Sequence, residues 1–268
     1  MLTVDILICT IDDGIGCVPA VLLPPAEGVR YLVSWQLSDS VPRTIPEALD
    51  HRCDVSIHTL RGRGLSANRN HALSLATADI VLIADDDVRY MPETVTRLRQ
   101  AFTDYPEAGI ITFQATDYNR HPLRTYPSST YTYGHRPRGS YVCSWEIACR
   151  RQAPLPPFDQ RFGIGAPYMT CGEEEVFVHR AAKMGCCVRY VPVPIVRTAD
   201  AGTGSTFLTA PGVQRAKGGV LCIIHGPIGA ALRCMKYATS LPRSVHRLTI
   251  LRRMLWGIAY TFFTDCSH

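Results

Sequence analysis

Three consecutive carboxylates, Asp85-Asp86-Asp87, follow directly after the apolar run at 80–84. A short continuous apolar run predicts a strand buried on both faces of a parallel sheet, and ligands bind beyond the carboxyl ends of such strands. Because the acids repel one another, they are costly unless a cation lies among them. Hard cations such as Mg²⁺ or Mn²⁺ take oxygen ligands from carboxylates and from substrate phosphates. The pattern predicts a metal-bridged phosphate site; the alternative is a solvated loop before a helix.

A second group of acids, Glu173-Glu174-Glu175, follows Gly172 at the start of a helix predicted over 173–184. Acids stabilise a helix N-terminus, so a purely structural role is one interpretation. The other is a general base, which must lie within hydrogen-bond reach of a hydroxyl. Successive helical residues point about 100° apart, so only one of Glu173 and Glu174 is expected to face a site.

The third pattern is the run Gly64-Leu65-Ser66-Ala67-Asn68-Arg69-Asn70. Ser66 is a candidate cap for a helix that ends near Ala76. Arg69 lies in the first turn of that helix, from which a guanidinium could reach a nucleotide base or phosphate. An exposed helical arginine with no such role is the alternative.

Strands and helices alternate over the first 115 residues, which predicts an α/β fold with a mostly parallel central sheet flanked by helices. The irregular region 116–140 is followed by a predicted strand at 141–149 and a Pro/Gly/aromatic loop at 154–172. A strand over 188–196 contains Pro192 and Pro194 and is expected at a sheet edge. Residues after 212 are expected to form amphipathic helices, with a break at Pro242. The predicted strands of the first part are 4–9, 29–35, 54–59, 80–84 and 109–113, and its helices are 66–76 and 92–105.

Length and charge suggest a body and a basic extension. The 268 residues are enough for one or two domains, and we expect one at 1–212 and a basic helical extension at 213–268. No acid occurs at 201–264, and residues 201–268 hold eight Lys or Arg against one Asp. Such an extension suits an anionic partner, for example a membrane surface, although it could equally pack on the body. Nucleic acid is not expected, since no motif for it is present.

Other features bear on the compartment. The eleven cysteines are odd in number and form no Cys-x-x-Cys, which favours a reducing environment. The start of the chain has the pattern of a strand and not of a signal peptide, and no apolar run reaches the length expected of a membrane span. These features predict a cytoplasmic protein, with peripheral attachment to the inner face of the cytoplasmic membrane through 213–268 left open.

The order of the three patterns resembles the family 2 glycosyltransferases of the GT-A fold, of the bacterial polysaccharide-synthesis type. The segment 78–88, Ala-Asp-Ile-Val-Leu-Ile-Ala-Asp-Asp-Asp-Val, is similar to the donor half of that family, and Gly172-Glu173-Glu174-Glu175 is similar to its acceptor half. The resemblance covers about residues 3–200. It implies a donor half at 1–115 and an acceptor half at 116–212.

The resemblance also implies a role for each matching residue. Asp85 and Asp87 match the outer acids of the Asp-x-Asp motif, which hold the ribose and a metal, Mn²⁺ or Mg²⁺, on the diphosphate. Glu174 matches the catalytic base, with Glu173 beside it. The implied reaction is inverting transfer of a sugar from a nucleotide-sugar, with a UDP-sugar favoured, to a hydroxyl of a glycan or lipid-linked acceptor. The residues implied to bind the donor are Thr10, Asp12, Arg69, Asp85, Asp86 and Arg197.

Two positions depart from the family pattern. Trp35-Gln36 stands where many relatives carry an acid at the end of the second strand, and Arg197 stands where many carry a metal- or diphosphate-binding His. Two other functions therefore stay open: a non-catalytic protein that binds nucleotide-sugars or partners, and a sugar-nucleotide pyrophosphorylase. The latter is disfavoured because no Gly-rich N-terminal phosphate loop is present. Tyr141, Trp145 and Tyr168 are candidate acceptor contacts, because aromatic faces suit sugar rings as well as cores.

Overall fold

The computed structural model describes residues 1–199, 202–242 and 244–265, and these form two compact units. The first unit comprises Met1–Arg63, Ala67–Pro157 and the chain from Arg180 to the gap at 200–201. The second comprises Gly64–Ser66, Phe158–His179 and the described residues after that gap. We describe each unit by itself.

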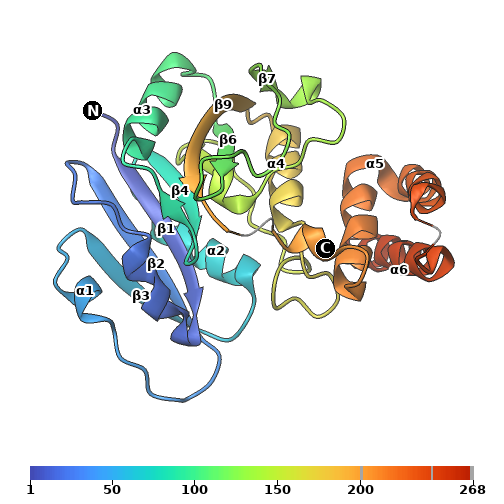
Figure 1. The fold of residues 1–268 in the computed structure, drawn as a ribbon, viewed down its shortest axis with the longest axis horizontal. Coiled ribbons are helices and arrows are strands. Elements are labelled where there is room, and N and C mark those ends of the chain that lie inside the picture. The colour runs from blue at the N-terminus through green and yellow to red at the C-terminus, as the bar shows by residue number, and fades with distance from the viewer. Residues whose placement is uncertain (200–201, 243, 266–268) are drawn as a thin grey trace. The chain divides into compact units, whose positions relative to one another are not determined.

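The first unit is built on a mixed sheet whose first half is parallel, as expected. Its strand order is β3-β2-β1-β4-β8-β6-β9-β5. Figure 1 labels β3, β2, β1, β4, β6 and β9 of this series. Strand β1 lies between β2 and β4 and runs parallel to both, and β3 runs parallel to β2. The carboxyl ends of these four strands therefore share one edge of the sheet. They span Val4–Ile11 (β1), Val29–Leu37 (β2), Val55–Arg61 (β3) and Ile80–Asp85 (β4).

The second half of the sheet contains the short strand β8 (Ile147–Arg150), antiparallel to both β4 and β6 (Ile110–Thr116). Only the end of the strand predicted at 141–149 forms, and it begins after a 3₁₀ turn, η3 (Ser144–Glu146). Strand β6 pairs in parallel with β9 (Val188–Arg197).

The prediction that β9 lies at a sheet edge is wrong. Two short strands, β7 (Tyr131–Thr132) and β5 (Arg89–Tyr90), also pair with it. Pro192 and Pro194 are tolerated because they lie between these two pairings: β7 pairs with β9 only up to Tyr190, and β5 pairs with it only from Val196. The register with β6 also shifts in this stretch, so neither proline has to donate to a ladder hydrogen bond.

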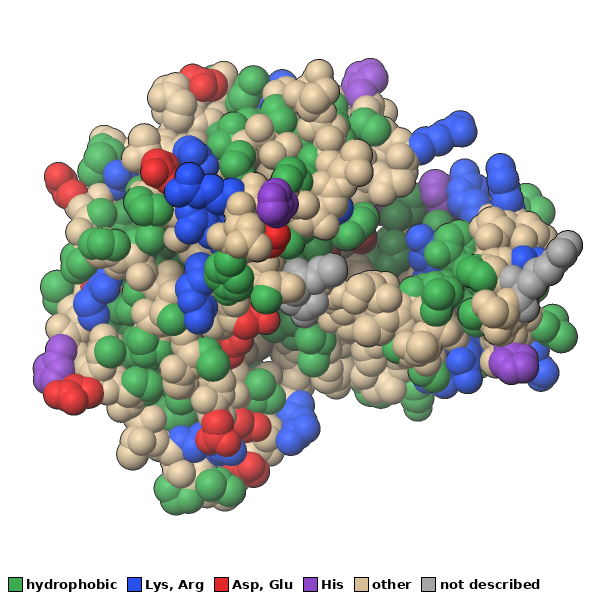
Figure 2. Space-filling view, viewed as in Figure 1, with side chains coloured by type: hydrophobic (Ala, Val, Ile, Leu, Met, Phe, Trp, Pro, Cys, Tyr) green, Lys and Arg blue, Asp and Glu red, His purple; other side chains and the backbone are tan. Residues whose placement is uncertain are grey.

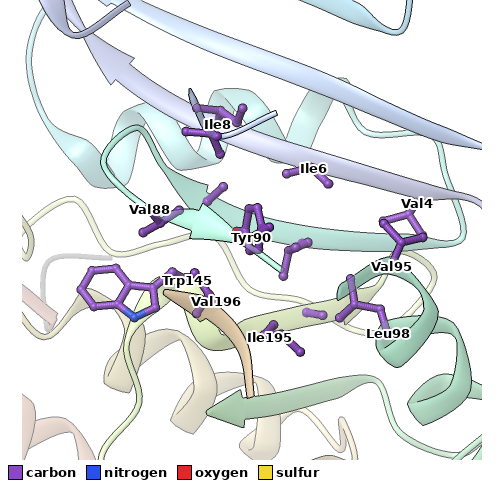
Figure 3. Close-up of a cluster of buried hydrophobic side chains, with 14 of the residues drawn as sticks. Val4, Ile6, Ile8, Val88, Tyr90, Val95, Leu98, Trp145, Ile195 and Val196 are labelled. Carbon is purple, nitrogen blue, oxygen red and sulfur yellow. The ribbon is translucent and has the colours of Figure 1, made fainter. Parts of the chain in front are cut away.

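Helices α2 (Leu65–Leu75) and α3 (Thr94–Asp104) confirm the predicted strand–helix alternation. A 3₁₀ segment η1 (Asp12–Ala20) and a short helix α1 (Glu47–Asp50) complete this part. Apolar side chains of β1, β5, α3 and β9 point toward one another and form the core (Figure 3). Val88 and Tyr90 in this cluster anchor the chain directly after the three aspartates.

The second unit is mostly helical. It contains the start of α4 (Glu173–Lys183), a short 3₁₀ turn η4 (Thr203–Thr206), α5 (Pro211–Ser240) and α6 (Arg247–Asp265). The break expected at Pro242 is confirmed. Helices α5 and α6 approach closely: a Cβ on Gly218 would lie 1.9 Å from the Met254 carbonyl oxygen, and one on Gly257 2.0 Å from that of Arg215.

Helix α5 is long and apolar enough to cross a membrane by length and composition. The sequence predicted no such segment, because small residues and proline interrupt the apolar run. However, Gly226 has φ 70° and ψ 167°, so α5 is two shorter helices joined at a kink before Pro227. The domain boundary predicted at 212 does not coincide with the limits of the two units, because the loop 158–172 packs with α5.

Candidate active site

The three aspartates lie where the sequence predicts them, at the carboxyl end of β4. Asp85 is the last residue of the strand, and the chain turns through the next two residues into β5. Arg69 Nη2 donates to Asp85 Oδ1 over 2.8 Å, and Ser144 Oγ donates to Asp85 Oδ2 over 3.0 Å. Arg69 is only 2% exposed. Charge-assisted bonds from two directions therefore fix the Asp85 carboxylate in orientation.

Asp86 is tied to the neighbouring strand. Thr10 Oγ1 donates to Asp86 Oδ2 over 2.5 Å. A Cβ on Gly14 would lie 2.5 Å from the same oxygen and 2.6 Å from the Thr10 hydroxyl, so only glycine fits there. Burial, with a smaller contribution from Asp85, raises the pKa of Asp86. Thr10 is itself buried, so it positions Asp86 and does not line the surface.

Asp12 joins the ends of β1 and β2. Its two carboxylate oxygens accept hydrogen bonds from the Ser38 backbone N–H over 2.9 Å and from the Ser38 hydroxyl over 2.5 Å. These bonds lower the pKa of Asp12. The indole Nε1 of Trp35 donates to the Asp12 carbonyl over 2.8 Å. Trp35 thus supports the loop after β1.

The acid that follows the second strand, and that the sequence prediction missed, is Asp39. Strand β2 continues to Leu37, two residues beyond the predicted end, so Ser38 and Asp39 follow its carboxyl end. Arg43 Nη1 donates to Asp39 Oδ1 over 2.7 Å and Arg43 Nε donates to Asp13 Oδ1 over 3.0 Å. Hydrogen bonding from Arg43 lowers the pKa of Asp39 to about 2. The polar run Ser38-Asp39-Ser40 was the available signal.

Helix α2 is held to the sheet by a buried polar network that positions Arg69. Asn68 Nδ2 donates to the Thr10 carbonyl over 2.9 Å, and Ser34 Oγ donates to Asn68 Oδ1 over 2.5 Å. The Ser34 hydroxyl also lies 2.7 Å from His71 Nδ1. Because Asn68 and Arg69 are adjacent and both buried, this network fixes the turn of helix that carries the guanidinium.

Arg197 ends β9 and is in register with Arg89 of β5, two residues beyond Asp87. On its other side it is in register with Thr116 of β6. The Arg197 Nε is buried and has no hydrogen-bond partner among the described residues. Two like charges opposite each other on neighbouring strands are unfavourable unless an anion offsets them. The sheet thus brings Arg197 to the same strand end as the aspartates.

Glu173 and Glu174 belong to the second unit. Gly172 has φ +86°, and a Cβ there would lie 2.7 Å from Val220 Cγ2 of α5, so glycine is required where α4 begins. Glu173 is buried, and its Oε2 would be 3.3 Å from a Cβ on Gly163. Glu174 is half-buried. Burial, with a smaller contribution from the Glu174 charge, raises the pKa of the Cys171 thiol. Both carboxylates act on the Cys171 thiol, and Glu173 is the more buried of the two.

The aromatic candidates separate into core and surface. Trp145 is buried in the core of the first unit (Figure 3), whereas Tyr141 and Tyr168 are exposed. Arg124 covers the Tyr141 ring at 4.3 Å. Tyr168 contacts the Trp256 and Tyr260 rings of α6 edge-on, with centroids 5.1 and 5.2 Å away. Tyr168 and Trp256 are exposed in this aromatic cluster, and Tyr260 is partly buried.

The donor set at Asp85–Asp87 fits a hard divalent cation. Every candidate ligand atom in this set is a carboxylate oxygen. A carboxylate oxygen that accepts one hydrogen bond still has a lone pair with which to bind a cation. Asp87 is exposed. Among the described residues, no group of three His, Cys, Asp or Glu side chains could hold a metal. A cation bound here would thus need additional oxygens, such as those of a substrate diphosphate.

Comparison with known proteins bears on the family and the fold. Residues 38–154 match the family model of glycosyl transferase family 2. This segment contains β4, the aspartates, Arg69 and Ser144. The matched segment is thus similar to sugar-transferring enzymes, and the sheet flanked by helices is of the GT-A type. The match covers less than half of the chain, so it relates this segment, and not the whole chain, to the family 2 glycosyltransferases. No curated protein sequence matches it significantly.

Solved structures with the same fold include those of the S. aureus protein TarS. The crystal structure of TarS 1-349 in complex with UDP-GlcNAc has a TM-score of 0.57 at 14% identity, over 96% of this chain and 82% of that one. Another crystal structure of TarS 1-349 has a TM-score of 0.52 at 16% identity, over 98% of this chain and 72% of that one. Against the longer TarS structure, with a TM-score of 0.53 at 17% identity, the match spans 44% of that protein's length. At these identities the likeness shows the fold.

Proposed function

We propose that this protein is an inverting glycosyltransferase that moves a sugar from a UDP-sugar to a hydroxyl of a glycan or lipid-linked acceptor. The observation that carries the proposal is the Asp85 carboxylate, held by Arg69 and Ser144 at the carboxyl end of β4 within the segment that matches the family. TarS, which has the same fold, is seen with UDP and with UDP-GlcNAc.

The donor side is assigned to the strand ends of the first unit. In this proposal Asp12 and Asp39 organise the loops that meet the nucleoside, through Ser38 and Arg43. Arg197 offsets the negative charge of the diphosphate. Its position opposite Arg89 favours this role, because an anion there would reduce the repulsion between the two cations. Thr10 keeps Asp86 in place, and Arg69 does the same for Asp85.

A divalent cation, Mn²⁺ or Mg²⁺, would be held by Asp85 and Asp87 together with the diphosphate. When bound it would stabilise the negative charge that grows on the leaving nucleoside diphosphate. The oxygen-only donor set supports this assignment, and the lack of a closed cluster of three ligands among the described residues makes binding dependent on the donor.

Glu174 is assigned as the general base. It accepts the proton of an acceptor hydroxyl as that oxygen forms a bond to the anomeric carbon. The bond from this carbon to the diphosphate oxygen breaks on the opposite side, so the configuration inverts. Glu173 is assigned a supporting role, because it is buried against the Gly163 loop. Tyr168 is the proposed contact for an acceptor ring.

Two alternatives remain as outcomes of experiment. Non-catalytic binding of a nucleotide-sugar would leave the donor site intact without turnover. A sugar-nucleotide pyrophosphorylase would form a nucleotide-sugar from a nucleoside triphosphate and a sugar phosphate, with release of pyrophosphate. We place the reaction on the cytoplasmic side of the membrane, since the cysteine pattern suits a reducing compartment.

The first test is a thermal-shift screen with UDP, GDP, CDP and dTDP, each with and without Mn²⁺. A ligand that binds only the folded protein raises its melting temperature. We expect a shift with UDP that requires Mn²⁺ and disappears in Asp87→Asn. A well-folded sample that shifts with none of the four would contradict the donor assignment.

A further inference from the structure

The second half of α5 exposes an apolar stripe. Ile228, Leu232 and Met235 are spaced by four and three residues and so share one face of the helix. They are 79%, 59% and 44% exposed. The face that packs against the rest of the unit is a different one, formed by Ala230, Cys234 and Ala238. The stripe is thus not needed for the core of the unit.

The charge around the stripe has one sign. Arg233 and Lys236 are exposed on the same half-helix. No acid occurs between Ala201 and Thr264, and the Asp265 carboxylate that follows pairs with Arg161 over 2.6 Å. On the face shown in Figure 2, the part formed by α5 and α6 carries Lys, Arg and hydrophobic side chains. An apolar stripe with basic neighbours is the pattern of a helix that lies at an anionic lipid surface.

The geometry of α5 favours a helix that lies on a membrane surface over one that spans the membrane. Its first half is fixed to the protein: a Cβ on Gly212 would lie 2.6 Å from Thr170 Oγ1, and one on Gly219 2.6 Å from Met169 Sδ. The kink at Gly226 then leaves only the residues up to Ser240 in the second half. This is shorter than the roughly 20 residues that cross a bilayer.

We propose that the second half of α5 docks the protein on an anionic membrane, with Ile228, Leu232 and Met235 inserted among the lipids and Arg233 and Lys236 at the headgroups. The inference is independent of the proposed reaction, because it concerns no residue of the candidate active site. It gives the basic C-terminal region a defined contact surface in one half-helix.

The test is co-sedimentation of the full chain with vesicles of phosphatidylcholine alone or mixed with phosphatidylglycerol. We expect binding to the mixed vesicles only, weakening as salt is raised. Ile228→Ser/Leu232→Ser/Met235→Ser should reduce that binding more than about tenfold. Arg233→Gln and Lys236→Gln should each reduce it about fivefold.

The matched control is Val41→Ser/Ile45→Ser/Met184→Ser, since these side chains are 59%, 43% and 54% exposed and lie in the first unit. It should bind vesicles like the wild type. Equal binding by the α5 triple variant, or equal binding to both vesicle types, would overturn the proposal. So would a wild-type oligomer that the α5 triple variant converts to monomer with vesicle binding unchanged, because the stripe would then join copies of the chain.

Discussion

At the scale of single residues, the Arg69–Asp85 ion pair of the candidate site also contributes to the stability of the fold. Arg69→Met leaves the Asp85 carboxylate, 18% exposed at its side chain, without its cationic partner. We expect a loss of about 3 kcal/mol in the free energy of unfolding, measured by urea denaturation. Arg69→Met/Asp85→Asn should recover part of this loss, because no lone charge remains. A double variant no more stable than the single one would show that the unpaired charge is not the cause.

For Arg197 we expect the opposite effect of a substitution on stability. Its charge is opposed to Arg89 and its Nε has no hydrogen-bond partner among the described residues. Arg197→Met should therefore leave the melting temperature unchanged or higher. UDP binding, measured by calorimetry with Mn²⁺, should weaken about tenfold through loss of one charge-assisted contact. Unchanged UDP affinity would remove Arg197 from the donor site.

Asp39 carries a pH-dependent prediction. Its pKa of about 2 lies below the ordinary value of 3.8, through Arg43. Its contribution to stability is therefore complete above about pH 4 and is lost as the pH falls toward about 2. Carboxyl carbon NMR at about pH 3, between these two pKa values, should show Asp39 mostly ionised in the wild type. Its protonated fraction should rise in Arg43→Gln, in which the Val41 N–H still donates to the carboxylate. A mostly protonated Asp39 in the wild type would contradict the role of Arg43.

These residues also show how far the site could be predicted from the sequence. The aspartates were predictable, because a continuous apolar run that ends abruptly in three carboxylates marks the end of a buried strand. Their partners were not, because Ser144 and Thr10 reach Asp85 and Asp86 across 59 and 76 residues of sequence. Asp39 was missed because apolar patterning locates a strand end only to within a few residues.

At the scale of elements, the close crossing of α5 and α6 depends on glycine. Gly218→Ala would place a Cβ 1.9 Å from the Met254 carbonyl and force the helices apart. We expect a loss of about 2 kcal/mol, seen as an earlier unfolding transition. Gly229→Ala on the same helix is the control, since its nearest neighbour would be the His225 Cβ at 3.2 Å. Because alanine favours a helix over glycine by about 1 kcal/mol, the control should be no less stable than the wild type. A Gly218→Ala variant as stable as Gly229→Ala would contradict the role of the close crossing.

The parallel half of the sheet followed from the alternating pattern, because each strand there is bounded by polar turns. The antiparallel half did not, since β8 has four residues and β5 and β7 have two each. Strands this short carry almost no periodic signal. Their positions are set by pairing with β4, β6 and β9, which only tertiary structure provides.

At the scale of the whole molecule, the chain distributes the proposed chemistry over two units. The aspartates that we assign to the donor belong to the first unit, and Glu174 belongs to the second. The sequence predicted both the aspartate motif and the glutamate motif. It did not predict that they would belong to different units, because that depends on the packing of the loop 158–172 on α5. We therefore expect nucleotide binding and turnover to be separable by substitution.

The most direct test is turnover of UDP-sugars with Mn²⁺, followed as UDP release, in the wild type, Glu174→Gln and Asp87→Asn. We predict that Glu174→Gln binds UDP normally and loses at least about a hundredfold in rate, the size of a general-base contribution. Asp87→Asn should lose Mn²⁺-dependent UDP binding as well. Full turnover by Glu174→Gln would contradict the central claim that this carboxylate is the base.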